Sequence, residues 1–434
     1  MMARGAGWMR GTGVAMLLAA ALAGAGGAQG AGRETGGGAG RSAGQPASGD
    51  FAGFLAAMRP KALALGVSAA TWERETAGLT PDLSLPNLDR GPRKPSHAGQ
   101  REFSATPAQY LSDRAMAATA AQGASLAARY RPQLAAIEQR FGVPGAVALA
   151  IFGRETGYGA NTGKYDGLRT LATQAWTGRR RETFAQEFLY ALKMLDDGVV
   201  SRPAMKSSWA GAMGLTQMLP SQYYRYGVNL DGAGRADIWT SVPDALASIA
   251  NHLRGEGWRP GERWAYEVAP PARADCTMAD PDAPRPWTQW SAAGYRPENG
   301  PAPGRGAQLA LLLPAGVYGP GFLVGANYFV LKAYNFSDLY VLYVGHLADR
   351  IAGGGPFATP WGKVMQPAAA QLAAMQRDLT RLGLYREKID GFAGMKTRLA
   401  VGAFQKASGL RTDCWPTPET LKAIAAAAKQ GATP

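Results

Sequence analysis

The sequence predicts a mainly α-helical protein in which one large domain is followed by a small helical module. In several segments, apolar residues recur at steps of three and four, which is the period of an amphipathic helix. A stretch rich in glycine and proline, residues 353–367, is a linker by composition and separates the large domain, 51–352, from the module, 368–428. The chain has 434 residues, of which 46% are hydrophobic, enough for more than one domain and a sizeable core.

The first 31 residues predict a cleavable secretory signal. Arg4 and Arg10 supply its positive charge, residues 14–22 are a short apolar run, and small residues follow. This run is too short to cross a bilayer and no run of 18 or more follows it, so we expect no transmembrane segment in the mature chain. No cysteine lies near the cleavage region, so we expect no lipid anchor. Residues 32–50, rich in glycine, alanine and serine, are predicted to be a disordered lead-in.

The first strong helical pattern ends at Gly142. Its apolar face has steps of four, four, three and four, at Leu126, Tyr130, Leu134, Ile137 and Phe141. Pro144 suits the first turn of the next helix, and Gly157 suits its end. The residues that lie four apart on one face of this second helix are Val147, Ile151 and Glu155.

The same period predicts further helices along the chain. Two of them are marked by Phe184, Phe188, Leu192 and Leu195, and by Leu246, Ile249 and Leu253. Residues 329–351 are again helical and rich in aromatics. Residues 270–303 hold eight prolines and fit either an elaborated loop or a few short strands. The module opens with a helix marked by Leu372, Met375, Leu379 and Leu382.

The composition excludes several classes of site. Two cysteines and three histidines are too few for a disulfide-framework fold or for a zinc site with the usual four ligands. Pairing of Cys276 with Cys414 is chemically permitted in an oxidising compartment, but it would tie the proline-rich stretch to the module, and we expect no pairing. The net charge of +14 alone is compatible with nucleic acid, but no recognition motif occurs, and export argues against that partner.

Glu155 is the first candidate for chemistry. The residues that lead up to it are almost wholly apolar, so its helix is expected to be buried on most sides. A carboxylate at the C-terminal end of such a helix faces desolvation and the negative end of the helix dipole, and both raise its pKa. A general acid that works near neutral pH needs a raised pKa. Taken alone, however, a glutamate at a helix end is most often simply solvated.

Two further segments carry polar groups of the kind that bind sugars. Residues 207–221 combine small residues with the hydroxyl of Ser208 and the amide of Gln217. Residues 332–340 hold three polar side chains within two turns, those of Tyr334, Asn335 and Tyr340. Each segment also has a plainer interpretation. The first fits a tightly packed turn without a ligand, and the second fits a helix with an aromatic stripe in the core.

Together these segments resemble the B-type lytic murein transglycosylases, bacterial lysozyme-like enzymes that cleave the glycan strands of peptidoglycan. Residues 153–159 match the family pattern G-x-E-T-x-[YW]-G. Residues 208–221 match S-[FW]-A-G-A-M-G-x-x-Q-F-x-P-S, with Met218 in place of the usual aromatic residue. Further agreement, in order and at near-standard spacing across 51–352, occurs at residues 171–174, 179–181, 237–239, 244–251 and 334–337.

The resemblance implies a lysozyme-like α+β catalytic domain and a periplasmic enzyme of cell-wall turnover. Such an enzyme cleaves the β-1,4 bond between N-acetylmuramic acid and N-acetylglucosamine and forms 1,6-anhydromuramyl ends. Glu155 would be the single catalytic acid and base, and the groups lining the sugar site would be Ser208, Gln217, Tyr334, Asn335 and Tyr340. No cofactor would be required, and we expect a monomer whose partner is the peptidoglycan strand. Phe152 stands where many relatives have tryptophan, and His252 stands where some have tyrosine. We expect these differences to bear on substrate affinity and not on the reaction class.

Two alternatives stay open, a hydrolytic muramidase and a non-catalytic wall-binding scaffold. A glycosidase that uses water normally needs a second carboxylate. The motif segments offer Glu155 and otherwise mostly neutral groups, and nothing around Asp338, the nearest other acid, places it opposite Glu155. A single carboxylate favours the transglycosylase, and the intact motif around Glu155 argues against the scaffold.

Some members of this family carry a calcium loop like that of an EF-hand, which would fall on residues 229–237. The candidate ligands for a structural Ca²⁺ are Asn229, Asp231, Asp237 and the more distant Asp244. Such a loop needs oxygen ligands at alternating positions. Ala233 occupies one of them and no bidentate glutamate closes the loop, so the sequence favours a turn with little affinity for calcium.

The C-terminal module resembles the three-helix peptidoglycan-binding domain that is often appended to wall enzymes. The pattern L-Q-x-x-L falls at residues 375–379, with Met375 in the first position, and D-G-x-x-G-x-x-T-x-x-A-x-x-x-F-Q falls at 390–405. The alternative is an appendage for solubility or dimerisation. From the composition of the linker we expect the module to be independent of the catalytic domain and to raise the effective concentration of the enzyme at the wall.

Overall fold

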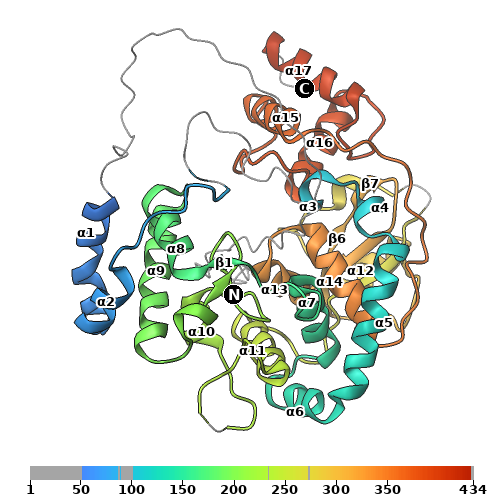
Figure 1. Ribbon diagram of the computed structural model, residues 1–434. Helices are drawn as coiled ribbons and strands as arrows, with labels where there is room; N and C mark the ends of the chain where they lie inside the picture. Colours follow the sequence, from blue (N-terminus) through green and yellow to red (C-terminus); the bar gives the residue numbers. More distant parts are fainter. Residues whose placement is uncertain (1–50, 87, 89–100, 233, 272–273, 432–434) are drawn as a thin grey trace, which may run out of the picture.

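The structure is a computed structural model that describes residues 51–86, 88, 101–232, 234–271 and 274–431 (Figure 1). The signal peptide and the lead-in predicted for residues 1–50 lie outside the described residues. The described part is mainly helical, as the sequence predicts, with a small sheet and a helical module at its C-terminal end. Its buried apolar side chains gather in separate clusters, and two of these clusters build the walls of the candidate site.

The first cluster surrounds helix α7 (Gly145–Thr156), in which residues 147–152 are all buried. A helix that is apolar on nearly every side must have neighbours all round it. Those neighbours, with the helices beside them, are α5 (Asp113–Arg129), α6 (Arg131–Phe141), α11 (Val242–Gly255), α13 (Ala326–Tyr334) and α14 (Asp338–Ile351). The short helices α3 (Arg101–Ser104) and α4 (Pro107–Tyr110) lie before them in the chain.

The second cluster lies on the other side of the site, where α8 and α9 pack against each other. Its helices are α1 (Phe51–Ala64), α2 (Ala69–Thr76), α8 (Gly167–Thr177), α9 (Arg181–Asp196) and α10 (Pro220–Tyr226). A short antiparallel pair, β1 (Tyr165–Asp166) with β2 (Lys206–Ser207), borders this group. The turn η1 (Arg202–Ala204) precedes β2. In Figure 1 these helices lie on the left of the molecule, the α7 group lies at the centre and lower right, and the C-terminal module lies above that group.

An antiparallel sheet with strand order β4-β6-β8-β3-β5 lies between α11 and α13 in the chain. Its strands are β3 (Ala265–Ala269), β4 (Arg285–Pro286), β5 (Arg296–Pro297), β6 (Gln308–Leu312) and β8 (Gly321–Val324). The proline-rich stretch contributes β4, β5, α12 (Trp287–Ala292) and the turn η2 (Cys276–Met278), so the short-strand interpretation of it is confirmed. The sequence did not predict β3, β6 and β8, because strands of four or five residues give too short a pattern.

Two helices predicted as continuous are broken in the structure. The first breaks at Tyr130 (φ −104°, ψ 23°), where α5 ends and α6 begins. Pro132 sits in the first turn of α6 because it has no N–H to donate, and its ring would clash inside a continuous helix. The apolar period runs through the break because both helices face the same core. The second break separates α13 from α14 at residues 335–337, and this break borders the candidate site.

The C-terminal module consists of α15 (Ala369–Arg381), α16 (Met395–Ala407) and α17 (Pro418–Gln430). It has its own apolar core, which includes Leu372, Leu379, Val401, Phe404 and Ile424. The buried amide of Gln376 fixes the loop before α16, because its oxygen accepts the N–H groups of Asp390 and Gly391 at 3.0 and 2.8 Å.

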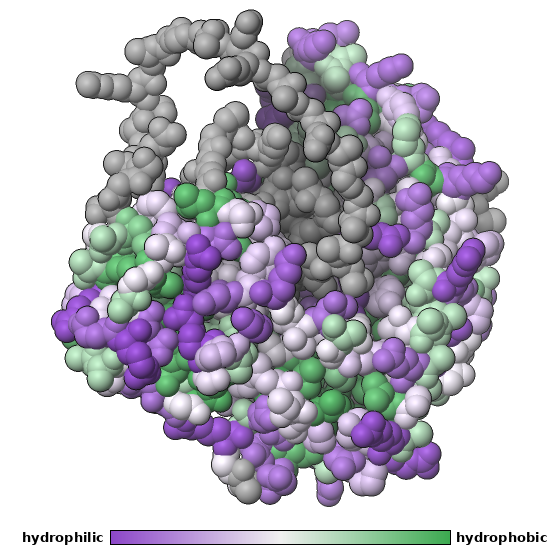
Figure 2. Space-filling view, in the orientation of Figure 1, coloured by the Kyte–Doolittle hydropathy of each residue, from purple (hydrophilic) through white to green (hydrophobic). Residues whose placement is uncertain are grey.

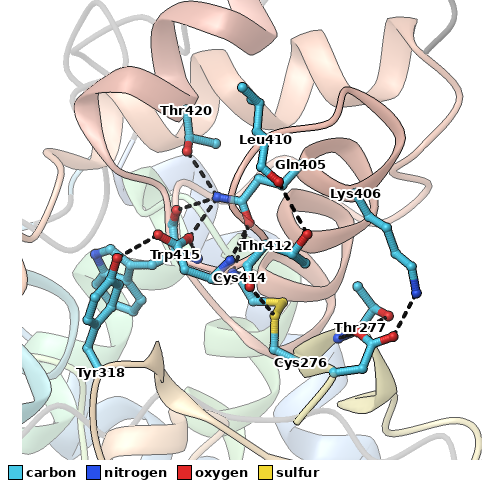
Figure 3. Close-up of a disulfide and its surroundings, with 12 residues drawn as sticks. Cys276, Thr277, Tyr318, Gln405, Lys406, Leu410, Thr412, Cys414, Trp415 and Thr420 are labelled. Carbon is cyan, nitrogen blue, oxygen red and sulfur yellow. Dashed lines mark hydrogen bonds and ion pairs between the residues drawn. A yellow bond between two sulfur atoms is a disulfide. The ribbon is translucent and has the colours of Figure 1, made fainter. Parts of the chain in front are cut away.

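The module is fastened to the catalytic domain, contrary to the expectation of two independent units. A disulfide joins Cys276 to Cys414, so the expectation that these cysteines stay unpaired was also wrong (Figure 3). Beside it, the Tyr318 hydroxyl donates to the carboxylate of Asp413 at 2.7 Å. On the other side, Lys406 pairs with Asp275 at 2.7 Å. Composition could not reveal these contacts, because they join residues far apart in the chain.

The linker, residues 353–367, is also packed rather than free. The ring of Phe357 stacks on His346 of α14 with centroids 3.7 Å apart. The carboxylate of Glu267 on β3 accepts the N–H groups of Ala358 and Thr359 at 3.0 and 2.9 Å. Although its glycines and prolines indicate a linker, this stretch is therefore packed against the catalytic domain.

On the face shown in Figure 2, hydrophilic side chains cover most of the surface and hydrophobic ones occur in scattered groups. Within the described residues, no single helix has the length and apolar character needed to cross a membrane. Helices α6 and α7 meet both requirements only when taken together, and the chain bends by 108° between them.

Candidate active site

Glu155 is the last residue but one of α7, and only 4% of its surface is exposed. Gly157 ends the helix in the left-handed conformation (φ 58°), as predicted. Because the carboxyl lies among the apolar side chains around α7, burial raises its pKa from 4.5 to about 7. The expectation of a raised pKa from burial thus agrees with the geometry.

Tyr340, in the first turn of α14, meets Glu155 directly. Its hydroxyl donates a hydrogen bond to Oε1 of Glu155. Tyr340 is itself buried, so this bond forms away from bulk water. The bond stabilises the ionised carboxylate and lowers the Glu155 pKa, but its effect is smaller than that of burial.

Arg154 and Glu102 are charged neighbours of Glu155 that the sequence analysis missed. The Arg154 guanidinium lies 5.9 Å from the ring centre of Tyr340 and donates to the Tyr110 hydroxyl at 2.7 Å. It lies 3.6 Å from the carboxylate of Glu102, which is almost fully buried. Arg154 lowers the Glu155 pKa and Glu102 raises it. The sequence did hold one signal for Arg154, because an arginine directly before the candidate acid is unusual inside such an apolar helix.

The turn at residues 214–217 forms another side of the site. Gln217 adopts the left-handed region (φ 51°), which is uncommon for a residue with a side chain. Its amide nitrogen donates to the carbonyls of Thr162 and Gly214 at 3.1 and 3.0 Å. Gly214 is required, because a Cβ there would lie 2.6 Å from the carbonyl oxygen of Ile238. The turn is tied to α7, since the hydroxyl of Thr156 donates to the carbonyl of Leu215 at 3.3 Å.

Tyr334 joins this turn to the end of α13. Its hydroxyl donates to the carbonyl of Thr216 at 2.9 Å. The ring of His252 lies between those of Tyr226 and Tyr334, with centroids 4.3 and 4.8 Å away. Burial and the charge of Arg225 lower the His252 pKa to about 3. The imidazole is therefore neutral and acts as an apolar support behind Tyr334.

Ser208 and Asn335 use their side-chain oxygens to shape the backbone. The Ser208 hydroxyl accepts the N–H groups of Ala210 and Ala212 at 3.3 and 3.2 Å. The Asn335 carbonyl oxygen accepts the N–H of Ser337 at 3.1 Å, within the break between α13 and α14. Among the predicted site residues, Tyr340 thus contacts Glu155 directly. Tyr334 and Gln217 both bond to the 214–217 turn, which the hydroxyl of Thr156 ties to the end of α7.

Asp338 is not placed as a second catalytic carboxylate. One of its oxygens accepts bonds from Lys332 and Tyr328 at 2.6 and 2.8 Å, and the other pairs with Arg398 at 2.9 Å. Burial alone would raise its pKa, but the two cations hold the pKa well below its usual range. Asp338 is therefore ionised at neutral pH and has a structural role.

Three of the four calcium-ligand candidates hold the backbone of residues 229–244 through their side chains. Both carboxylate oxygens of Asp244 accept backbone N–H groups, from Leu230 at 3.1 Å and from Asp237 at 2.9 Å. The Asp237 carboxylate accepts the N–H groups of Trp239 and Thr240, both at 2.9 Å. Asn229 accepts the N–H of Gly232 at 3.0 Å. Among the described residues, no three acidic, histidine or cysteine side chains gather where they could hold a metal ion.

Comparison with known protein families assigns most of the chain to two domain families. The family described as transglycosylase SLT domain matches residues 50–349, more than half of the chain. The chain belongs to the transglycosylase SLT domain family. A putative peptidoglycan binding domain matches residues 369–424. Glu155 and the other site residues described above all lie inside the transglycosylase SLT domain.

The chain is also similar to individual proteins and solved structures. Membrane-bound lytic murein transglycosylase B of Escherichia coli (strain K12) is 32% identical over 237 residues, which are 52% of this chain and 61% of that protein. The match thus spans less than two thirds of that relative. The crystal structure of SltB3 from Pseudomonas aeruginosa in complex with NAG-NAM-pentapeptide is 37% identical, with a TM-score of 0.78. Its complex with NAG-anhNAM-pentapeptide is 36% identical, with a TM-score of 0.75. In both, 86% of this chain and 99% of the other are covered. The predicted resemblance to lytic transglycosylases and the lysozyme-like, mainly helical fold are confirmed.

Proposed function

We propose that this protein is a peptidoglycan lytic transglycosylase that acts in cell-wall turnover. It cleaves the β-1,4 bond between N-acetylmuramic acid and N-acetylglucosamine and leaves 1,6-anhydromuramyl ends. The observation that carries the proposal is one buried carboxyl, Glu155, whose pKa of about 7 keeps much of it protonated at neutral pH. The relatives named as lytic murein transglycosylases support the same reaction.

In the first step, Glu155 donates its proton to the glycosidic oxygen. Since the Tyr340 hydroxyl donates to Oε1, we assign the transferred proton to Oε2. The N-acetyl group of the substrate stabilises the positive charge that develops at the sugar carbon. The departing strand takes the proton, and Glu155 is left as a carboxylate that Tyr340 and Arg154 stabilise.

In the second step, Glu155 acts as the base. It takes the proton of the 6-hydroxyl of the muramyl sugar, and the oxygen of that hydroxyl bonds to the anomeric carbon. The hydroxyl is tethered to the reacting sugar, so its effective molarity exceeds that of water. No second carboxylate is needed to activate a water molecule, in contrast to hydrolytic glycosidases. Glu102 is close enough to affect Glu155, but its partner is the Arg154 guanidinium.

We assign the sugar contacts to the residues around this acid. The 214–217 turn with Gln217, the Ser208 turn and the α13–α14 break with Tyr334 and Asn335 present the polar groups. We also propose export to the periplasm, which the signal-like pattern of residues 1–31 supports, and action as a monomer on peptidoglycan strands.

The test is a digestion of purified sacculi in water enriched in heavy oxygen, followed by mass analysis of the new ends. The proposal expects unlabelled anhydro ends, lighter than hydrolysed ends by one water, which is about 18 mass units for ordinary water and about 20 for water that carries heavy oxygen. Labelled, reducing muramic acid ends would establish the muramidase alternative. Binding of sacculi without new ends, from folded protein, would establish the scaffold alternative.

A further inference from the structure

The C-terminal module reaches the catalytic domain next to the candidate site. Arg398 on α16 pairs with Asp338, the first residue of α14, with Nη2 and Oδ2 2.9 Å apart. Only 8% and 6% of the two side chains are exposed. The pair lies in the wall of a cleft of about 1360 Å³ that the catalytic domain and the module line together. An ion pair withdrawn from water this far holds its two elements in a fixed geometry, because either charge alone would be costly to bury.

Asp338 connects this contact to both helices of the break. Its other oxygen accepts bonds from Tyr328 and Lys332, which belong to α13. Asp338 therefore joins α13, the start of α14 and the module. Two cations share one carboxylate, so the loss of Arg398 leaves Asp338 held from the α13 side alone, by Lys332 and Tyr328.

The first turn of α14 also carries Tyr340, two residues after Asp338. Ser337 caps this turn, with its hydroxyl accepting the N–H of Tyr340 at 3.4 Å. From the same turn, the Tyr340 hydroxyl reaches Glu155. A change in the position of Asp338 is transmitted to Tyr340 through a single helical turn, and so to the one hydroxyl that donates to the Glu155 carboxyl in the described structure.

We infer that Arg398 is a positioning residue for the reaction, acting through Asp338 and the first turn of α14 on the Tyr340–Glu155 contact. The inference rests on the proposed function and extends it. The peptidoglycan-binding module completes the support of the active site, in addition to holding the enzyme on the wall. The disulfide from Cys276 to Cys414 keeps the module attached when the ion pair is removed, so attachment and positioning are separable by experiment.

The test is Arg398→Met in the full, oxidised chain, assayed on short soluble glycan strands. We expect kcat to fall on the order of 10- to 100-fold with KM nearly unchanged, since a small misplacement of a catalytic group has effects of this size. We also expect the alkaline limb of the pH–rate profile to move to higher pH, because a weaker Tyr340 bond stabilises the Glu155 carboxylate less. Arg398→Lys, which keeps the charge, should restore part of the lost kcat and part of the shift in the alkaline limb.

The matched control is Lys406→Met. It removes another ion pair between module and catalytic domain, to Asp275, without touching α14. This variant should keep the wild-type kcat and pH limb. In an Asp338→Asn background, Arg398→Met should have little further effect, because the two residues act in one chain of contacts. If Arg398→Met does not fold, Arg398→Gln, which keeps a donor, takes its place in each comparison.

Two results would overturn the inference. One is a folded Arg398 variant with the kcat and the pH limb of the wild type. The other is an equal loss in Lys406→Met, which would assign the effect to general loosening of the module. Because the wild type is assayed alongside, inactivity of the wild type on these strands would refute the proposed function instead.

Discussion

Replacing Glu155 with glutamine should make the protein more stable at alkaline pH while abolishing its turnover. The Glu155 pKa is about 7 in the folded protein against an ordinary 4.5, so its ionisation opposes folding. Below pH 4.5 both the folded and the unfolded chain carry the protonated acid, and burial of the charge has no cost. As the pH rises from 4.5 to 7, the unfolded chain ionises first, and the folded protein loses stability until the pH passes 7. The difference corresponds to about 3 kcal/mol at pH 8 and less than about 1 kcal/mol at pH 5.

The assay is urea unfolding of the wild type and Glu155→Gln at pH 5 and at pH 8. The amide cannot ionise, so the variant should gain about 3 kcal/mol over the wild type at pH 8. Glu138→Gln is the matched control, because Glu138 is exposed on α6 and its replacement should change stability equally little at both pH values. A stability difference between Glu155→Gln and the wild type that does not depend on pH would refute the reasoning.

The remaining predictions concern the reaction, the disulfide and calcium. Turnover of sacculi by Glu155→Gln should fall by at least about 10²–10⁴-fold, the usual loss when general acid catalysis is removed, and a near wild-type rate would disprove the assignment. Tyr340→Phe should move the alkaline limb of kcat/KM upward by about one to two pH units, since a hydrogen bond to a charged group contributes about 1.5–3 kcal/mol; an unmoved limb would contradict the Tyr340–Glu155 bond. Cys276→Ser should lower the free energy of unfolding by about 2–5 kcal/mol in denaturant titrations, and equal stability would show that the disulfide does not constrain the chain. Millimolar calcium, compared with a chelator, should leave the melting temperature unchanged, whereas a rise of several degrees would show that residues 229–244 bind the ion.

Local patterns predicted the part of the site that lies within one segment. The apolar run of α7 and the glycine at 157 placed Glu155 at the end of a buried helix, and burial alone was enough to anticipate a raised pKa. The same approach placed several of the longer helices, such as α9, α11 and α15, because each of them buries one face at the period of 3.6 residues. The periodicity predicted α5 and α6 as one helix, because the apolar period continues across the break between them. Pro132 is the only sequence signal of that break.

Contacts between distant segments were beyond the sequence. Tyr340 reaches Glu155 across 185 positions, and Glu102 reaches Arg154 from a separate short helix. The same limit applies to the disulfide and to Arg398, whose partner Asp338 is 60 residues away. A linker composition describes the conformational freedom of a chain segment, and it contains no information about the surface on which that segment packs.

The central claim is that Glu155 is a protonated acid near neutral pH, and infrared difference spectroscopy measures this most directly. The spectrum of the wild type minus that of Glu155→Gln isolates the carboxyl band of this one residue, and the band is followed from pH 4 to pH 10. We predict that a protonated carboxyl band disappears with a midpoint near pH 7, at the same pH as the alkaline limb of kcat/KM. A band already ionised at pH 5, or a midpoint that does not follow the activity limb, would contradict the account.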